Sequence, residues 1–349
     1  MNLKSGWQHL EDDQVAISTD IGYERAENQD RVVVLRCSGS GENEYLLTAI
    51  CDGMGGMQDG QICASLAVSG VIVAFLKSHH LAIKDRLLST ALAANQAVHQ
   101  RYRGKGGATL SAVCVSSRGE TWGLNVGDSR IYGGKSGKLT ALSTDDTIAG
   151  QIGREGGGAE ANSLLQFIGI GSDIDPHIVE IPLDLDRIVI TTDGAHGIPR
   201  DALALLVTRA QTSFEVCRRV VQAAQWMGTR DNGTAACVQM PLTILPPAVE
   251  RSVRLWDPWG ELHLLNPVDN RPAARNDAVD PGQEKQPDVA SDEPVALKTA
   301  RSERTHGPRK RADKAKVTQP RLPTEDRPTK PSQSIQITEI PEPPAEGDR

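Results

Sequence analysis

Short apolar runs typical of strands occur in adjacent pairs along this chain. Val32–Cys37 and Tyr45–Asp52 flank one turn-rich loop, and Ala108–Val115 and Glu120–Val126 flank another. Strands joined by a short loop pair antiparallel, whereas parallel pairing needs a long crossover. Apolar residues at helical spacing also come in pairs of segments, which are Ile62–Leu76, Ala82–Tyr102, Asp201–Ala210 and Phe214–Met227. The pattern predicts antiparallel sheets packed together and covered by paired helices, and it disfavours a βαβ repeat.

Composition divides the chain into unequal parts. Of its 20 prolines, 17 follow Met240, and from about Asn266 onward the chain is rich in charge and has no aromatic residue. Such a segment cannot bury enough apolar surface to offset the entropy lost on ordering. We therefore expect a folded domain over 1–245, a hairpin extension over 246–266 and a disordered tail over 267–349. A basic block in the tail, Arg301–Lys316, reads as solvated linker or as a docking element for an acidic surface.

The predicted hairpin extension carries two tryptophans. Apolar and polar residues alternate through Ser252–Leu265 on both sides of the turn-like segment Asp257-Pro258-Trp259-Gly260. Either the hairpin docks on the main domain, or Trp256 and Trp259 form a recognition element for a partner.

Several function classes are disfavoured. The six cysteines show no zinc-ligand spacing, so we interpret them as reduced core thiols of a cytosolic protein. The N-terminus has no apolar signal core, and the longest apolar run, Leu66–Leu76, is too short to cross a membrane. The net charge of −7 disfavours nucleic acid as a partner. We expect a soluble, cytoplasmic protein that binds neither nucleic acid nor membrane.

Four aspartates stand at the boundaries of apolar runs beside glycine or asparagine, and a fifth closes the motif RAENQD. Their motifs are RAENQD, AICDGMGG, LNVGDSR, IVITTDG and TRDNG, which contain Asp30, Asp52, Asp128, Asp193 and Asp231. Strand ends would place these carboxylates at the rim of a sheet, where two like charges ~4 Å apart cost roughly 4 kcal/mol at an effective dielectric near 20. Divalent cations relieve that repulsion, and paired cations serve phosphoryl chemistry.

The order of six motifs resembles that of the metal-dependent serine/threonine protein phosphatases of type 2C. RAENQD, CDGMGG, GGATL, NVGDSRIY, TTDG and RDNGTA follow one another as in that family, from about Val15 to Met240. The chain is similar to the short bacterial form, followed by a C-terminal tail. The resemblance implies an α+β fold: a four-layer α-β-β-α sandwich of two antiparallel sheets flanked by paired helices.

The resemblance also implies metal ligands. Asp52 would bridge two ions, Mn²⁺ or Mg²⁺, with the backbone carbonyl of Gly53 beside it. Asp193 and Asp231 would complete the protein ligands of the first ion. Asp30 would belong to the shell of the second ion, directly or through water.

The same resemblance implies a reaction. Asp128 with Asp193 would form a weaker third metal site, and Arg25 would hold the substrate phosphate, so that Arg25, Asp52 and Asp193 are the expected catalytic residues. A hydroxide bridging the two metals would attack phosphorus in line, without a covalent enzyme intermediate.

Some positions depart from the family pattern. Gln29 stands where many relatives have glutamate, which predicts weaker binding at the second metal. Met54 stands where many have histidine and cannot donate a proton, so the acid for the leaving group is unassigned. His196 is either its substitute or a structural histidine. The flap between Gly150 and Asn162 is short.

Other polar residues near the motifs have competing roles. Asn28, Asp20 and Asn232 are expected to shape turns, with Asp20 alternatively an outer-shell partner of the metals. Asp145 and Asp146 either reach a third metal or solvate a mobile flap, and we favour solvation. Ser129 and Arg130 are expected to fix the loop around Asp128.

The implied function is a phosphoserine/phosphothreonine protein phosphatase that opposes a cytosolic serine/threonine kinase and acts as a monomer on a phosphorylated protein. One alternative is a non-catalytic binding module tethered to a signalling complex by the tail. Another is a phosphatase of small phosphoesters. Asp52, Asp193 and Asp231 are all present, which favours an enzyme.

Overall fold

The structure is a computed structural model, and it describes residues 5–10, 14–38, 43–151, 163–243 and 252–265, all within the compact unit Met1–Ala274. The expected disordered tail over 267–349, with its basic block, lies outside the described residues. So do residues 152–162 of the expected flap.

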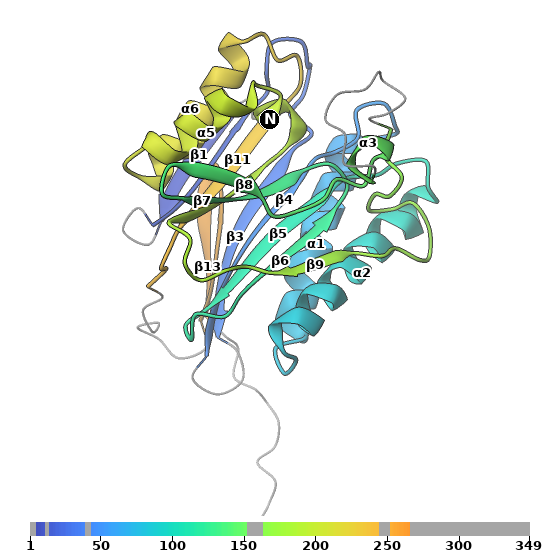
Figure 1. Cartoon of the computed structure of the whole chain (residues 1–349). Helices are drawn as coiled ribbons and strands as arrows, with labels where there is room; N and C mark the ends of the chain where they lie inside the picture. Colours follow the sequence, from blue (N-terminus) through green and yellow to red (C-terminus); the bar gives the residue numbers. More distant parts are fainter. Residues whose placement is uncertain (1–4, 11–13, 39–42, 152–162, 244–251, 266–349) are drawn as a thin grey trace, which may run out of the picture. The chain divides into compact units, whose positions relative to one another are not determined.

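Two antiparallel sheets face each other (Figure 1). The first has six strands in the order β1-β2-β11-β10-β7-β8. Their bounds are β1 Ser5–Leu10, β2 Val15–Asp20, β11 Gly233–Gln239, β10 Arg187–Thr191, β7 Arg130–Lys135 and β8 Lys138–Ala141.

The second sheet has seven strands in the order β13-β12-β3-β4-β5-β6-β9. Their bounds are β13 Gly260–Leu265, β12 Ser252–Asp257, β3 Arg31–Ser38, β4 Glu44–Cys51, β5 Leu110–Ser116, β6 Thr121–Val126 and β9 His177–Glu180. The predicted hairpin around Asp257–Gly260 thus supplies two strands of this sheet, because β12 pairs with β3.

Paired helices cover the outer face of each sheet (Figure 1). The helices α1 (Gly60–Lys77) and α2 (Ile83–Tyr102) pack on the seven-stranded sheet, and α5 (Arg200–Arg209) and α6 (Ser213–Trp226) pack on the six-stranded sheet. Two single-turn helices are α3 (Ile148–Gln151) and α4 (Asp193–His196). The predicted α+β fold with four α-β-β-α layers is confirmed.

Alternation along the central strands fills the spaces between the layers. In β4, Leu47 and Ala49 pack toward α1 and α2, whereas Leu46 and Ile50 point into the core between the two sheets. This is the period-two geometry of a strand buried on both faces. Each large apolar side chain buried in this way contributes about 1.5–3 kcal/mol. A third apolar layer separates the six-stranded sheet from α5 and α6.

Helix α1 is the one described helix whose length and apolar composition would suit a membrane span. In this fold its apolar residues, among them Val71 and Phe75, instead join the core against α2 and the sheet. All six cysteines are buried free thiols, as expected from their apolar surroundings.

The two tryptophans of the hairpin differ in exposure, and Trp256 is buried. Trp256 is 4% exposed and packs in the core between the sheets, with the Arg254 guanidinium 4.6 Å from its ring centroid. Trp259 donates from Nε1 to the backbone carbonyl of Ser5 on β1 (3.2 Å). The recognition alternative is therefore wrong for Trp256, whose side chain is out of reach of a partner.

Candidate metal and phosphate site

The strand register brings the five aspartates to one edge of the sandwich. Arg31 pairs with Cys51, so Asp30 before β3 and Asp52 after β4 are neighbours. In the facing sheet, Thr191 of β10 pairs with Arg130 of β7 and with Ala235 of β11. The residues that flank these pairs are Asp193, Asp128 and Asp231. Antiparallel strands that begin and end together therefore gather carboxylates from distant parts of the sequence.

Asp30 is the most deeply buried of the five. Its carboxylate Oδ2 accepts hydrogen bonds from Thr234 Oγ1 (2.6 Å) and Thr192 Oγ1 (3.1 Å), while Oδ1 is buried without a hydrogen-bond partner. Burial, followed by the negative charge of Asp193, raises the pKa of Asp30 to about 7. A buried acceptor left unsatisfied is destabilising, so this oxygen suits a ligand that supplies positive charge.

Three further aspartates share this electrostatic environment. Burial and then the charge of Asp30 raise the pKa of Asp52 well above its usual range. Burial, followed by Asp231, raises the pKa of Asp193. Burial and then Asp193 raise the pKa of Asp128 to about 7. Asp193 nevertheless reaches open space, because its outer surface lines two pockets. Bound cations would relieve this repulsion among the carboxylates, so the cluster favours cation binding.

The donor chemistry fits hard divalent cations. Carboxylate and carbonyl oxygens are the ligands these ions prefer, and Mg²⁺ keeps several waters, so each ion needs few protein ligands. Within the described residues, no three His, Cys, Asp or Glu side chains converge closely enough to hold an ion by themselves. Asp231 is directed into an ion pair with Arg25.

Gly53, the expected carbonyl donor, lies where the chain passes close to the start of α1. A Cβ at this position would come within 2.2 Å of the Gly60 carbonyl oxygen, so only glycine fits. Gly53 also bridges to Ala108, which fixes the loop between β4 and α1 against the segment before β5. The glycine therefore sets the path of the backbone directly after Asp52.

Arg25 lies at the mouth of this site. Its guanidinium pairs with Asp231, and that hydrogen bond raises the pKa of Arg25, with burial opposing it. Arg25, Asp193 and Asp231 line one side of a pocket of about 490 Å³ together with Glu24 and Thr229. The fork expected to bind phosphate is thus beside the carboxylates, engaged with one of them.

Two asparagines hold the loops that carry the aspartates. Asn232 accepts a hydrogen bond from the Gln29 backbone at Oδ1 (2.8 Å), and its Nδ2 donates to the Ile21 carbonyl (2.7 Å). Asn28 Oδ1 accepts from the backbone N–H of Asp30 (3.0 Å). The Gln29 side chain turns aside and donates to Glu27 (2.9 Å). These contacts are the turn-shaping roles expected for asparagine.

Two other predicted positions hold backbone geometry. Asp20 accepts the backbone N–H of Gly22 (2.8 Å), as a turn former does. The backbone N–H of Met54 donates to the Gly107 carbonyl (3.1 Å).

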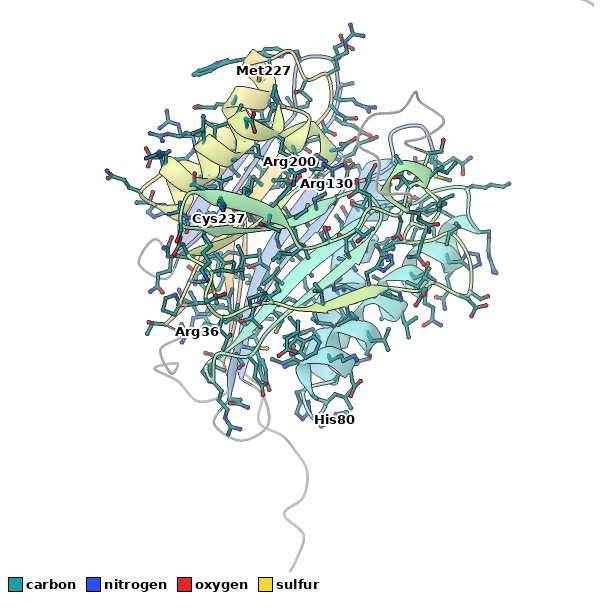
Figure 2. All side chains as sticks on the ribbon, in the orientation of Figure 1. Arg36, His80, Arg130, Arg200, Met227 and Cys237 are labelled. Atoms are coloured by element: carbon teal, nitrogen blue, oxygen red, sulfur yellow. The ribbon has the colours of Figure 1, made fainter. Side chains whose placement is uncertain are left out.

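A second pocket, of about 810 Å³, extends from Asp128 and Asp193 toward the flap and α5. Arg130 and Arg200, both labelled in Figure 2, line it. Asp145 belongs to the same lining and accepts two hydrogen bonds from Arg130, at 2.9 Å to Oδ1 and 2.7 Å to Oδ2. The pocket adjoins the carboxylates and is large enough for side chains that flank a phosphorylated residue.

The expected solvating role of Asp145 and Asp146 is wrong. Asp146 is 3% exposed and accepts from the Gly127 backbone (2.8 Å) and from Gln166 Nε2 (3.0 Å), with His177 Nε2 at 2.7 Å. Asp145 is held by Arg130. Both carboxylates have fixed protein partners and anchor the base of the flap to the Asp128 loop.

His196 does not have the properties of a proton donor. Its ring stands edge-on to Tyr132, and Nδ1 lies 2.9 Å from Thr191 Oγ1. Burial, then the positive charge of Arg130, lower the pKa of His196 to about 3. The imidazole is therefore neutral at physiological pH, which favours the structural alternative for this residue.

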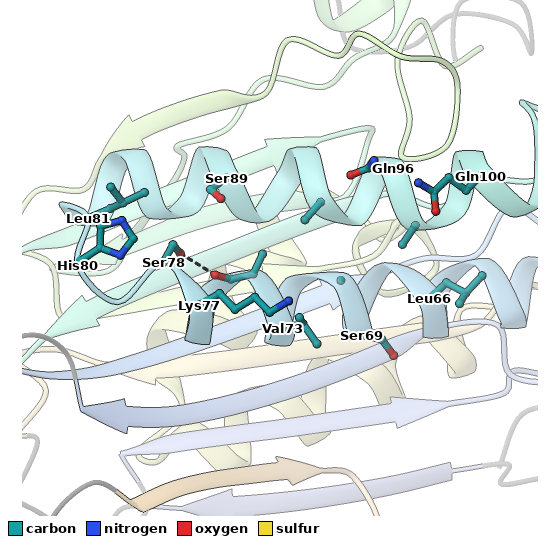
Figure 3. Close-up of a pocket in the computed structure, with 14 residues that line it drawn as sticks. Leu66, Ser69, Val73, Lys77, Ser78, His80, Leu81, Ser89, Gln96 and Gln100 are labelled. Atoms are coloured by element: carbon teal, nitrogen blue, oxygen red, sulfur yellow. Dashed lines mark hydrogen bonds between the residues drawn. The ribbon is translucent and has the colours of Figure 1, made fainter. Parts of the chain in front are cut away.

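A third pocket is unrelated to the carboxylates. It is a groove of about 640 Å³ between the outer faces of α1 and α2, drawn in Figure 3. Leu66 and Val73 contribute apolar surface, Lys77 a cation and Gln96 an amide, and its lining includes no carboxylate. This chemistry does not suit metal or phosphoryl transfer, so the strand-end carboxylates remain the candidate site.

Comparisons with known proteins agree with this geometry. A protein phosphatase 2C-type protein of Streptococcus pyogenes is 27% identical over 243 residues, which cover 64% of this chain and 96% of that protein. The serine/threonine protein phosphatase PstP of Mycobacterium tuberculosis is 30% identical over 236 residues, covering 63% of this chain and 43% of PstP.

Solved structures show the same fold. The PPM Ser-Thr phosphatase MsPP from Mycobacterium smegmatis, in complex with cacodylate, superposes with a TM-score of 0.54 at 26% identity, covering 64% of this chain and 97% of MsPP. The model of the protein phosphatase 2C family matches residues 23–230, which include four of the five strand-end aspartates and stop one residue before Asp231. By fold, by motif order and by this match over more than half of its length, the chain belongs to the protein phosphatase 2C family and is a phosphatase enzyme.

Proposed function

We propose that this chain hydrolyses phosphoserine and phosphothreonine in proteins and uses two divalent cations, Mn²⁺ or Mg²⁺, bound at the strand-end carboxylates. The observation that carries the proposal is the carboxylate cluster itself. Buried within it, Asp30 Oδ1 has no hydrogen-bond partner, while its neighbours raise one another's pKa. A relative with this fold, the PstP catalytic domain, has been solved in complex with two manganese ions.

We assign the ligands as follows. Asp52 would be shared by the two ions and Gly53 would offer its backbone carbonyl, with Asp193 and Asp231 completing the protein ligands of the first ion. Asp30 would serve the second ion, directly or through water. Asp128, close enough to Asp193 for the charge of Asp193 to raise its pKa, would serve a weaker third site with it.

When bound, such a pair of cations lowers the pKa of a water toward neutrality, giving the nucleophile for in-line attack, and neutralises charge on the phosphoryl oxygens. The chain's own residues orient the substrate. Arg25 offers a planar fork that matches two phosphoryl oxygens. In the structure, Asp231 pairs with the Arg25 guanidinium. If Asp231 bound a cation with its oxygens instead, the Arg25 guanidinium would be available to bind the phosphate.

Beyond the site, we propose that the substrate is a phosphorylated protein supplied by a serine/threonine kinase of the same compartment, the cytoplasm. The catalytic unit would act as a monomer. The pocket lined by Arg130 and Arg200 supports a protein substrate, because it adjoins the carboxylates and can receive residues beside the phosphorylated one.

The test is Mn²⁺-dependent hydrolysis of p-nitrophenyl phosphate and of a phosphothreonine peptide. Asp52→Asn and Asp193→Asn should each abolish turnover of both compounds, because each removes a charge that the cations require. Asp184→Asn is the matched control, since Asp184 is an exposed aspartate paired with Lys135 and should leave turnover unchanged.

Turnover that persists in EDTA and in both site variants would rule out the metal mechanism. Turnover of p-nitrophenyl phosphate without any turnover of phosphopeptides would favour a phosphatase of small phosphoesters instead.

A further inference from the structure

The turn of the C-terminal hairpin packs tightly on β1. Trp259 Nε1 donates to the Ser5 carbonyl at 3.2 Å. A Cβ on Gly6 would lie 2.5 Å from Trp259 Nε1 and 2.9 Å from Pro258, so the turn approaches the strand more closely than any side chain allows. Asp257 Oδ1 accepts the backbone N–H groups of Trp259 (2.8 Å) and Gly260 (2.9 Å), which fixes the turn.

The same turn lies beside the first residues of β3. Strand β12 pairs with β3 up to Trp256 opposite Val34, so the residues after Trp256 continue toward the start of β3. A pocket of about 280 Å³ shows that they arrive there, because Asp257 and Trp259 line it together with Arg31 and Val32. Asp30 directly precedes that end of β3. The hairpin therefore reaches the back of the carboxylate cluster.

Arg31 connects the turn to the loop that carries Asp30. Its Nη1 donates to the carbonyl of Asn28 (3.0 Å) and to the carbonyl of Asp30 itself (2.6 Å). Its Nε donates to Ser65 Oγ on α1 (3.0 Å). The guanidinium thus clamps the backbone on both sides of Gln29 and ties it to the helix.

Asp257 acts electrostatically on this guanidinium. Arg31 and Asp257 line the same pocket, which brings the Asp257 carboxylate near the guanidinium. Glu27 and Asp30, the other acids near this guanidinium, belong to the loop that Arg31 clamps, whereas Asp257 comes from the hairpin. A half-buried arginine without that charge would be less favourable in its position against the carbonyls.

We propose that Arg31 and Asp257 are positioning residues for Asp30, and that the hairpin β12–β13 is thereby part of the metal site. The hairpin lies beyond residues 23–230, the part that the family model matches. The inference rests on the proposed function, because it concerns how Asp30 is held toward the second cation. Residues that orient a metal ligand change metal affinity without contacting the ion.

Isothermal titration calorimetry of the full chain with MnCl₂, alongside the Mn²⁺ dependence of p-nitrophenyl phosphate turnover, tests the proposal. Arg31→Gln should weaken Mn²⁺ at one site by about tenfold or more, the usual range for such residues. Saturating Mn²⁺ should restore turnover to within a few-fold. Arg31→Lys, which keeps the charge but not the planar guanidinium, should have a Mn²⁺ affinity between those of the unaltered chain and Arg31→Gln.

Asp257→Asn removes the charge but keeps the Oδ1 acceptor of the turn, so it should weaken Mn²⁺ by a few-fold with the hairpin intact. Its matched control is Glu261→Gln, the same acid-to-amide change in the same hairpin, where Glu261 pairs with Arg254 at 2.9 Å. That control should bind Mn²⁺ within twofold of the unaltered chain. The double variant Arg31→Gln/Asp257→Asn should be no weaker than Arg31→Gln alone, because Asp257 acts through Arg31.

Mn²⁺ affinity within twofold of the unaltered chain for both Arg31→Gln and Asp257→Asn would overturn the inference. If Arg31→Gln does not fold, Asp257→Asn decides by itself. Loss of Mn²⁺ binding in Asp52→Asn together with unchanged binding in the Arg31 and Asp257 variants would leave the proposed function standing and refute only this inference. An unaltered chain that binds no Mn²⁺ would refute both.

Discussion

Replacing Asp30 by asparagine should stabilise the metal-free protein at alkaline pH, because the native carboxylate is held where its charge is unfavourable. Burial and the charge of Asp193 raise the pKa of Asp30 to about 7 from its ordinary value of 3.8. At pH values between the pKa of the unfolded chain and that of the folded state, the folded state keeps a proton that the unfolded state has released. The folded state binds more protons there, so its stability falls as pH rises and reaches its lowest contribution above pH 7.

The size of the effect follows from the same linkage. One proton of difference changes the unfolding free energy by about 1.4 kcal/mol per pH unit. From pH 5 to pH 8 Asp30 therefore destabilises the folded state by about 3 kcal/mol, and most of this change occurs below pH 7, where the folded-state carboxyl is half ionised. Asparagine does not titrate, so the variant gains about 3 kcal/mol relative to the unaltered chain over that interval.

Urea unfolding in EDTA, followed by tryptophan fluorescence at pH 5 and pH 8, measures this difference. Asp184→Asn is the control, because Lys135 lowers the pKa of that exposed carboxyl and it stays ionised at both values. Adding Mn²⁺ should reverse the order, since the ion stabilises a folded state that offers it an ionised Asp30. A difference between Asp30→Asn and the unaltered chain that is the same at pH 5 and pH 8 would refute the reasoning.

Four further outcomes are expected. Arg25→Ala should raise the KM for p-nitrophenyl phosphate by at least tenfold while the protein still binds Mn²⁺; an unchanged KM in steady-state kinetics would remove Arg25 from the phosphate site. Because the His196 imidazole is neutral, His196→Gln should leave the pH–rate profile unchanged between pH 6 and 9. Loss of the alkaline limb of that profile would show that the histidine does donate a proton. Trp256→Ala should destabilise the fold by about 3–5 kcal/mol in urea unfolding, as for other buried aromatic side chains; a loss below about 1 kcal/mol would contradict its burial between the sheets. Truncation after Leu265 should leave turnover of the small substrate within a few-fold, and a collapse would show that the tail is part of the active unit.

Much of this architecture could be predicted because the sequence is locally consistent with it. The run Tyr45–Asp52 is apolar at nearly every position, and the strand it forms is buried on both faces. Hairpin partners stand close in sequence, so the pairing of β3 with β4 and of β5 with β6 follows from loop length alone. The β3–β4 pairing brings Asp30 next to Asp52, whereas Asp128, Asp193 and Asp231 join them only because the two sheets face each other.

Other features depend on partners too distant in sequence to be read from local patterns. Strand β1 was not predicted, because Ser5–Leu10 is an edge strand whose alternate residues stay exposed and whose only apolar residues are Trp7 and Leu10 besides Gly6. Asp146 lies in a polar, glycine-rich segment that reads as solvated, but its partners Gly127 and His177 come from other elements.

Arg86 shows the same limit inside a helix. The apolar spacing of α2 predicts Leu87 at the core, but not that Arg86 beside it is fully buried. Its Nε donates to the Phe75 carbonyl (2.7 Å), and its guanidinium lies 3.5 Å from the centroid of the Phe75 ring. Because Phe75 comes from α1, this contact depends on how the two helices pack, which the sequence of α2 alone does not determine.

The residues at the strand ends are not those that folding stability alone would favour. Over most of the length of the two sheets, apolar side chains alternate into one of three cores, whereas here the same strands end in carboxylates that oppose one another's ionisation. A fold selected for stability alone would place asparagine or serine at these boundaries, since neutral side chains can satisfy the same turns without repulsion. Thr192 and Thr234 satisfy only one oxygen of Asp30 and leave the other buried and unpaired. The three apolar layers offset the destabilisation of the ionised cluster, which bound cations relieve, so cation binding at this edge should stabilise the whole sandwich as well as enable its chemistry.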